Sequence, residues 1–271
     1  MRTMLARRSP LVLLLATLTA PHADAATLTW QTPGAGDWFD GGNWDSGGAV
    51  PGPGDLAIID NGGDATAGAA VTVAALRLGL ASAPGTAAGT LTLTGDDLTL
   101  AGSLGVGNAG SGAPGATASA SLDVAGAIRG ATGSLLVGSN TAAGGSASGA
   151  ITAAGYAGDH SFIGIGRDSA GGSGTGSLDV TGNLGLPATA SFLEVGVAVL
   201  DGLDADGRLT AAGGDINAGV ALIGAHLGSE TAPGEVHGIG DIGTGTLTSE
   251  TGGNLNVGFR DSNHSGNVSG E

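Results

Sequence analysis

The sequence predicts an all-β fold, a right-handed parallel β-helix (a solenoid) of about seven coils with an aromatic N-terminal cap. A short apolar box that ends in glycine returns about every 30 residues, and a second apolar box follows it at a steady distance. The chain after residue 25 also has no long glycine-free segment with helical periodicity. Self-similarity at such a period is typical of stacked-coil architectures.

The first box has the pattern apolar-x-apolar-Gly. It occupies residues 76–79, 104–107, 135–138, 163–166, 193–196, 221–224 and 255–258. The second box places two apolar or small residues around one variable residue and has a glycine two residues later. It occupies residues 91–93, 122–124, 151–153, 178–180 and 209–211, and 247–249 is the next recognisable copy. Each repeat therefore predicts two or three short strands separated by turns.

Alternation inside the boxes predicts which side chains face inward. Successive residues of a strand face opposite sides, so Leu122 and Val124 are expected in the core and Asp123 in solvent. The glycine after each box is expected to supply a positive φ or a tight bend. Coils that stack at about 4.8 Å would make a rod of about 34 Å from seven coils. Only stacking buries the apolar side of each coil.

Two other interpretations stay open at this point. A β-sandwich or another β-rich fold also accommodates short strands with glycine-rich turns. A chain with 56 glycines and few aromatics is compositionally close to disordered sequences. The charged fraction of 12% and the fixed offsets of Leu, Ile and Val favour an ordered fold. The stretch 226–242 departs from the repeat and predicts a protruding loop or an extra edge strand, with drift of a decaying repeat as the alternative.

Residues 1–25 have the pattern of a secretory signal peptide. Arginines at positions 2, 7 and 8 precede the apolar run 11–20, and small residues follow at positions 23 and 25. No later segment has the roughly 18 consecutive apolar residues of a membrane helix, so no membrane insertion is expected. The chain is therefore expected to be exported, to an extracellular or outer-membrane surface location.

Charge and cysteine content narrow the classes of partner. The formal net charge is −16, lysine is absent, and there is no cysteine. Binding to a phosphate backbone depends on Lys and Arg, so nucleic acid is excluded as a partner. The fold is not held by disulfides.

Residues 26–72 lack the repeat and are expected to form the N-terminal capping segment. They contain all three tryptophans, Trp30, Trp38 and Trp44, followed by Val-Pro-Gly-Pro-Gly-Asp at 50–55. A solenoid needs its terminal coil covered, and large aromatics are suited to this. The alternative is that the same three tryptophans form a ligand-binding platform, because aromatic faces suit sugar rings.

The layout resembles exported bacterial β-helix proteins, namely autotransporter passenger domains and related strand-repeat surface proteins. The resemblance is carried by the signal peptide, the tryptophan block with its VPGPGD segment, and the recurrent LxVG and (S/T)LxV boxes. It implies a secreted or cell-surface β-helix that is often adhesive. The C-terminal membrane barrel of autotransporters, with its amphipathic strands and aromatic girdle, has no counterpart in this sequence. The β-helix repeats at 73–271 are therefore expected to be incomplete at the C-terminus.

Few residues are grouped as catalysis or metal binding requires. Asp96 and Asp97 resemble the paired carboxylates of glycosidases, but His237 is expected about five coils away. The segment 201–207 has closely spaced carboxylates that suit Ca²⁺, without the glutamate of an EF-hand loop. The remaining histidines after the signal segment show no zinc-ligand spacing; they are His160, His226 and His264.

These observations favour a non-enzymatic surface or secreted β-helix that presents an extended face for adhesion or matrix assembly. No cofactor and no metal are expected. The expected partners are surface glycans or other surface proteins, and the open last coil around Leu255 and Val257 predicts self-association. The alternative is a polysaccharide lyase or glycoside hydrolase on the same fold.

Overall fold

The computed structural model describes residues 25–130, 132–199, 203–227, 235–244, 246–257 and 267–270. Residues 1–24 lie outside this part, and with them almost all of the expected signal peptide. The elements are one short 3-10 helix and strands. In chain order they are β1 (Thr27–Thr29), β2 (Gly34–Asp37), η1 (Gly41–Asn43), β3 (Leu56–Ile59), β4 (Asn61–Ala67), β5 (Val71–Val73), β6 (Ala75–Ala81), β7 (Thr86–Leu93), β8 (Leu98–Leu100), β9 (Leu104–Ala109), β10 (Thr117–Arg129), β11 (Ser134–Val137), β12 (Ser146–Ala157), β13 (Phe162–Asp168), β14 (Ser173–Ala198), β15 (Asp204–His226), β16 (Glu235–Asp241), β17 (Thr246–Val257) and β18 (Asn267–Gly270).

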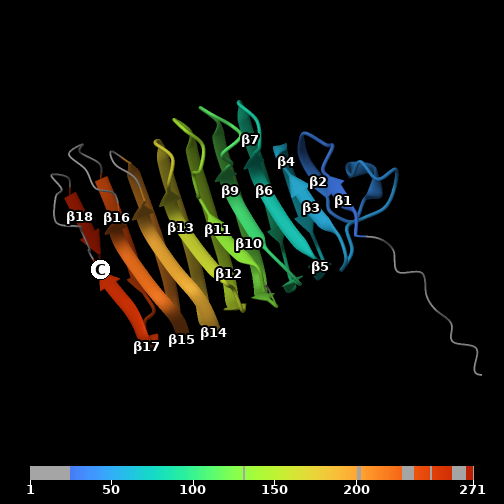
Figure 1. Ribbon diagram of the computed structural model, residues 1–271. Coiled ribbons are helices and arrows are strands. Elements are labelled where there is room, and N and C mark those ends of the chain that lie inside the picture. The colour runs from blue at the N-terminus through green and yellow to red at the C-terminus, as the bar shows by residue number, and fades with distance from the viewer. Residues whose placement is uncertain are drawn as a thin grey trace, which may run out of the picture.

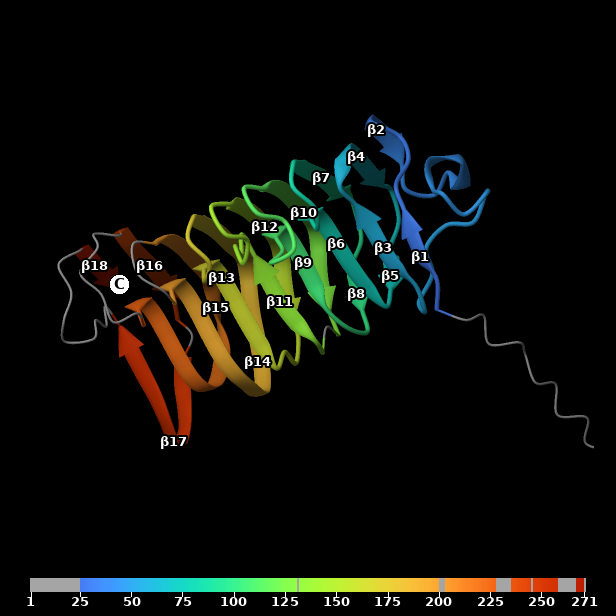
Figure 2. The same cartoon turned by 45° about the horizontal axis from the view of Figure 1, so that its top comes forward.

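The strands stack into a parallel β-solenoid of about seven turns (Figures 1 and 2), as the repeat predicts. Each complete turn contributes to three parallel ladders. The first ladder runs through β1, β3, β6, β9, β11 and β13 and then through the later parts of β14, β15 and β17. The second runs through β2, β4, β7, β10, β12, β14, β15, β16 and β18. The third joins β5 and β8 to segments of β10, β12, β14, β15 and β17.

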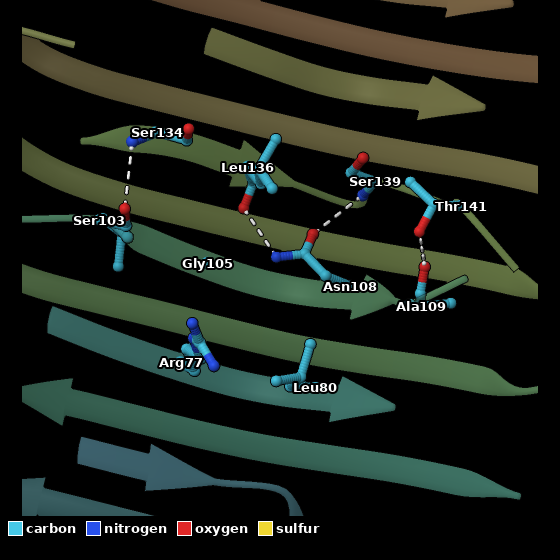
Figure 3. Close-up of a pocket in the computed structure, with 12 residues that line it drawn as sticks. Arg77, Leu80, Ser103, Gly105, Asn108, Ala109, Ser134, Leu136, Ser139 and Thr141 are labelled. Carbon is cyan, nitrogen blue, oxygen red and sulfur yellow. Dashed lines mark hydrogen bonds between the residues drawn. The ribbon is translucent and has the colours of Figure 1, made fainter. Parts of the chain in front are cut away.

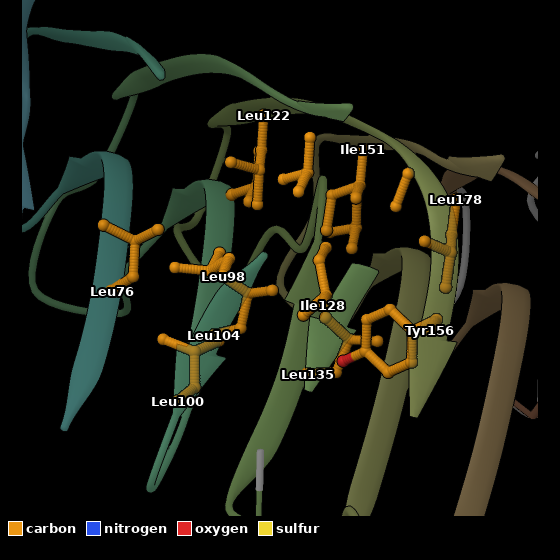
Figure 4. Packing of buried hydrophobic residues seen from close by; sticks show 14 of the residues in the cluster. Leu76, Leu98, Leu100, Leu104, Leu122, Ile128, Leu135, Ile151, Tyr156 and Leu178 are labelled. Atoms are coloured by element: carbon orange, nitrogen blue, oxygen red, sulfur yellow. The ribbon is translucent and has the colours of Figure 1, made fainter. Parts of the chain in front are cut away.

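Both repeated boxes keep their register from coil to coil. Leu122 pairs with Leu91 on one side and Ile151 on the other, and Leu135 pairs in the same way with Leu104 and Ile163. These residues are buried, whereas Asp123 is exposed, which confirms the predicted alternation. Figure 4 shows side chains of successive coils meeting in one continuous core. Because each coil adds one residue to each column, apolar area is buried mainly between coils.

The glycines of the two boxes have different roles. All six described first-box glycines have φ between +57° and +64°, at positions 79, 107, 138, 166, 196 and 224. This left-handed conformation is disfavoured for residues with a Cβ, and it recurs at the same place in six successive coils of the first ladder. The second-box glycines do not have positive φ. Two of them, Gly126 and Gly182, instead lie against backbone of the preceding coil, where a Cβ would meet Asp96 and Ala154.

A second glycine column was not recognised in the sequence. Gly149, Gly176 and Gly207 lie in the second ladder, and a Cβ on each would meet first-ladder backbone. The two ladders therefore approach each other closely beyond the main core. The corner between the first and second ladders contains small side chains, because the two ladder backbones lie close together there. They are alanines 81, 87, 109, 113, 116, 118, 142 and 147. This narrow corner explains the high glycine and alanine content.

The N-terminal segment forms the first strands of the stack. β1 pairs with β3 and β2 with β4, so the parallel ladders start at Thr27, before residue 73 where the boxes begin. Trp44 lies between the other two tryptophans in edge-to-face contacts, with ring centroids 5.1 Å from Trp30 and 4.8 Å from Trp38. Such pairs add to the stability that burial of the rings provides.

The last coils correct two assignments made from the sequence. β16 pairs on both sides, with β15 and β18, so residues 235–241 are a regular second-ladder strand and not an extra edge strand. Gly240 pairs with Leu209, the first apolar residue of a second box. Because glycine stands at this position in β16, the second-box pattern is not visible in the sequence of that strand. Leu247 pairs with Ile216 in the third ladder, so 247–249 is not a second box. Residues 228–234 and the side chains of 248–271 lie outside the described part, so the expected open last coil stays a prediction.

Candidate functional site

The three tryptophans lie in the core at the N-terminal end of the solenoid. None is more than 3% exposed, and they belong to the same cluster as the first coils. The indole N–H of Trp44 donates to the carbonyl of Trp38 at 2.9 Å, and that of Trp30 donates to Thr32. Burial leaves no ring face for a sugar to stack on. The alternative of a sugar platform therefore finds no support, and the cap stays a prediction with which this burial is consistent.

One of the paired carboxylates, Asp97, connects two coils. Asp97 accepts hydrogen bonds at 2.7 Å from the backbone N–H of Ala127 and from Nε of Arg129. The backbone bond, and then the arginine, hold the pKa of Asp97 below its usual value. His237 lies five coil steps further along the second ladder, about 24 Å at 4.8 Å per coil. Asp97 and His237 therefore do not share a site.

The candidate calcium segment is extended from residue 204 onward. Asp204 and Asp206 are exposed on β15 and flank buried Ala205, so they line one outer face instead of converging around an ion. Residues 200–202 lie outside the described part. Across the described residues, no three His, Asp or Glu side chains come together in a way that would hold a metal.

His160 is buried in the turn that leads into β13. Its Nδ1 lies 3.0 Å from the carbonyl oxygen of Gly133, which can only accept, so Nδ1 carries the proton. Nε2 then accepts from the Tyr156 hydroxyl at 2.5 Å. Burial lowers the pKa of His160, with the Gly133 bond opposing, and burial raises the pKa of Tyr156. Both rings are thus held neutral in a structural pair.

A row of outward side chains follows the first ladder beside its left-handed glycines, and its N-terminal coils, from β6 to β11, border a hollow. The first-ladder groove is defined here by the middle residue of each first box and the residue after its glycine. These are Arg77 and Leu80, Gly105 and Asn108, Leu136 and Ser139, Gly164 and Arg167, Glu194 and Val197, and Leu222 and Ala225. Although the middle residues point away from the core, Glu194 and Leu222 are each only 6% exposed. Neighbouring side chains therefore cover them.

The C-terminal part of this groove is apolar. Leu222 packs with Val197 and Ala225 in a cluster separate from the main core. Phe192 lies beside Phe162 in register and is 45% exposed. Exposed aromatic rings on a sheet surface are typical of contact sites.

A buried ion pair lies between the apolar and polar parts of the groove. Nε of Arg167 is 2.6 Å from Oε2 of Glu194, and its guanidinium also lies 5.7 Å from the Phe162 ring centroid. Burial raises the pKa of Glu194, and the arginine partly offsets this. Because Arg167 and Glu194 neutralise each other, neither charge is available to a ligand.

The N-terminal part of the groove opens into a hollow of about 350 Å³. Figure 3 shows its wall, made from β6, β9, β11 and the turn that follows. Ser103 Oγ accepts from the backbone N–H of Ser134 at 3.2 Å, and Asn108 bridges to the next coil through Leu136 and Ser139. The lining includes Arg77, Gly105 and Thr141 and contains no carboxylate. A Cβ on Gly105 would meet Nδ2 of Asn108 at 2.7 Å, so a larger residue there would displace that amide.

The second ladder has a different outer face. One of its columns alternates threonine and aspartate, in the order Thr92, Asp123, Thr152, Asp179, Thr210 and Asp241. A threonine separates each carboxylate from the next, which avoids stacking like charges. The hydroxyl of Thr210 donates to Asp179. The face is flat, polar and acidic.

Comparisons with protein-family models, with curated protein sequences and with solved structures find no match to this chain. The fold class, an all-β parallel solenoid, therefore rests on the chain's own structure. None of the helical residues in the described ranges forms a segment with the length and apolarity to cross a bilayer.

Sequence reasoning did not find the groove. Alternation predicts that the variable position of each first box faces solvent, as Asp123 does in the second box, and this is wrong for Glu194 and Leu222, which are each only 6% exposed. A signal was present, since Leu136 and Leu222 are apolar at that position. An outward position that carries leucine in two coils indicates a partly covered surface.

Proposed function

We propose that this chain is a non-enzymatic, exported β-solenoid that binds polysaccharide along the first-ladder groove and serves in surface adhesion or matrix assembly. The groove carries this proposal because its residues cross successive coils between the exposed ring of Phe192 and the hollow at β6, β9 and β11, which is lined by hydroxyl and amide groups. A linear polymer of sugar rings matches both features, since apolar ring faces stack on aromatics and hydroxyls pair with polar side chains.

Export is part of the proposal and depends on the N-terminal segment. Residues 1–25 have the charge and apolar pattern of a secretory signal. The negative charge and the absence of lysine suit a soluble surface protein and disfavour nucleic acid. No specific observation supports the lyase or hydrolase alternative. Asp97 forms an ion pair with Arg129 and lies far from His237.

The proposal is tested with residues 26–271 and a panel of labelled neutral and acidic polysaccharides. We expect at least one polymer to be retained, and Phe192→Ser and Leu136→Ser to weaken retention by about tenfold, which corresponds to about 1.4 kcal/mol. Thr152→Ala and Thr210→Ala, on the second ladder, are the matched controls and should retain the polymer.

Two results would contradict the proposal. Retention of no polymer by the folded protein would remove polysaccharide as the partner. Equal weakening by groove and second-ladder variants would remove the groove. Release of new reducing ends during incubation would instead support the enzymatic alternative.

A further inference from the structure

Arg77 stands apart from the other arginines of the described residues. Arg129, Arg167 and Arg208 lie 2.7, 2.6 and 3.7 Å from Asp97, Glu194 and Asp179, respectively. Arg77 is exposed and has no hydrogen bond or ion pair to any described residue. In a chain with net charge −16, a cation without a partner carboxylate is unusual. Its charge is therefore available to a ligand.

The hydrogen-bonding capacity left over around Arg77 consists mainly of donors. Ser103 Oγ already accepts the backbone N–H of Ser134, so its own proton is free to donate. Asn108 uses its carbonyl oxygen for Ser139 N–H and one amide proton for Leu136 O, which leaves one N–H. The guanidinium adds five N–H donors.

The same wall has no charged acceptor for a ligand. No Asp or Glu lines the hollow. Thr141 donates its hydroxyl proton to Ala109 O at 2.9 Å, so only its oxygen lone pairs remain. Ser134 Oγ makes no hydrogen bond to a described residue. Buried Ser139 Oγ likewise has no partner among them. A ligand that complements this wall has a negative charge near Arg77 and hydroxyl groups, which can both donate to and accept from the serine and threonine hydroxyls.

We infer that the hollow is a subsite for the carboxylate of a sugar acid, with Arg77 as the anion-binding residue and the neighbouring hydroxyl and amide donors contacting the sugar hydroxyls. This rests on the proposed function and names the chemical class that one end of the groove selects. A bidentate arginine–carboxylate pair gives both strength and geometric selectivity. The volume of about 350 Å³ is in the range of small-ligand sites.

The test uses residues 26–271 and free glucuronate, with glucose as the neutral probe, in ligand-observed NMR titrations at low salt. We expect glucuronate to bind and glucose to bind at least about tenfold more weakly. Arg77→Gln should remove the preference for glucuronate. Arg208→Gln is the matched control, because it deletes the same charge on the second ladder and should leave the preference unchanged.

A second variant tests the position of the ligand. Gly105→Val should displace the Asn108 amide, narrow the hollow and weaken glucuronate binding without changing the net charge. Equal affinity for glucuronate and glucose would overturn the inference, as would equal losses in Arg77→Gln and Arg208→Gln. If a neutral polymer is still retained through Phe192 in that case, the proposed function stands and only the subsite fails. Conversely, glucuronate binding with no polymer retained would keep the subsite and reject the function.

Discussion

Asn140 donates through Nδ2 to Oδ1 of Asp168 at 3.0 Å, from one coil to the next, and both side chains are fully buried. The same carboxylate accepts backbone N–H groups of Ala170 at 3.2 Å and Gly172 at 3.0 Å. The Asn140 carbonyl oxygen accepts from Ala142. Two consecutive turns are therefore held by a single polar column in an otherwise apolar corner.

Replacement of Asp168 by alanine is expected to destabilise the protein by about 1–3 kcal/mol, because several buried donors lose their acceptor. Urea unfolding followed by circular dichroism measures this. Asp123→Ala, which removes an exposed carboxylate, should stay within about 0.5 kcal/mol. Equal effects would mean that the Asn140–Asp168 column does not stabilise the turns.

Three glycine-to-alanine variants separate the cost of a left-handed backbone from the cost of a steric clash between the two ladders. Gly138→Ala should be strongly destabilising, since φ is +61° and the new Cβ would meet the backbone carbonyl of Thr175. Gly144→Ala has a similar φ of +65° but open space, so it should lose only the conformational part, about 1–2 kcal/mol. Gly95→Ala, with neither feature, should be close to neutral. Unfolding free energies in any other order would contradict the close approach of the two ladders.

The inward and outward register can be tested at adjacent residues. Val180→Asp should place an unpaired charge in the core and destabilise the protein by several kcal/mol. Asp179→Ala removes a half-exposed carboxylate that accepts from Thr210 and should stay under about 1 kcal/mol. Thermal unfolding of both variants distinguishes the two sides of the strand. Similar losses would mean that the register is wrong.

The His160–Tyr156 pair predicts a pH dependence of stability. The pKa of His160 is lowered in the folded state, so the unfolded chain binds more protons as the pH falls below the ordinary histidine value of about 6.5. Stability is therefore fully present above that pH and is lost as the pH falls toward the folded-state pKa. Urea unfolding between pH 7.5 and pH 5.5 should show the loss.

His160→Gln should flatten this dependence. Asp168 and Glu194 have the opposite sign, because burial raises their pKa values and acid relieves that penalty. Their window runs upward from the ordinary carboxyl values of about 4, so the histidine is identified by the part of the slope that disappears in His160→Gln, not by the total slope. An unchanged slope in His160→Gln would assign the dependence to other groups.

The box pattern predicted the strand direction, the inward residues and the first-box glycine conformation because backbone sterics and burial act locally. Leu122 and Asp123 differ in exposure as period-two alternation requires. The Gly149 column was missed because its cause is non-local, a contact with a different strand of another coil. For the same reason the unpaired state of Arg77 was not predictable. Whether an arginine has a carboxylate partner depends on the strand register, which places Asp97, Glu194 and Asp179 beside the other three arginines of the described residues.

The groove residues follow one another at one per coil, because a single register is kept along the first ladder. Read along the molecular axis, the middle positions are Arg77, Gly105, Leu136, Gly164, Glu194 and Leu222, separated by about 4.8 Å each. Duplication or deletion of one repeat would move every later position by one such step relative to Arg77. Partner preference in a molecule built this way is open to change by repeat number as well as by point substitution.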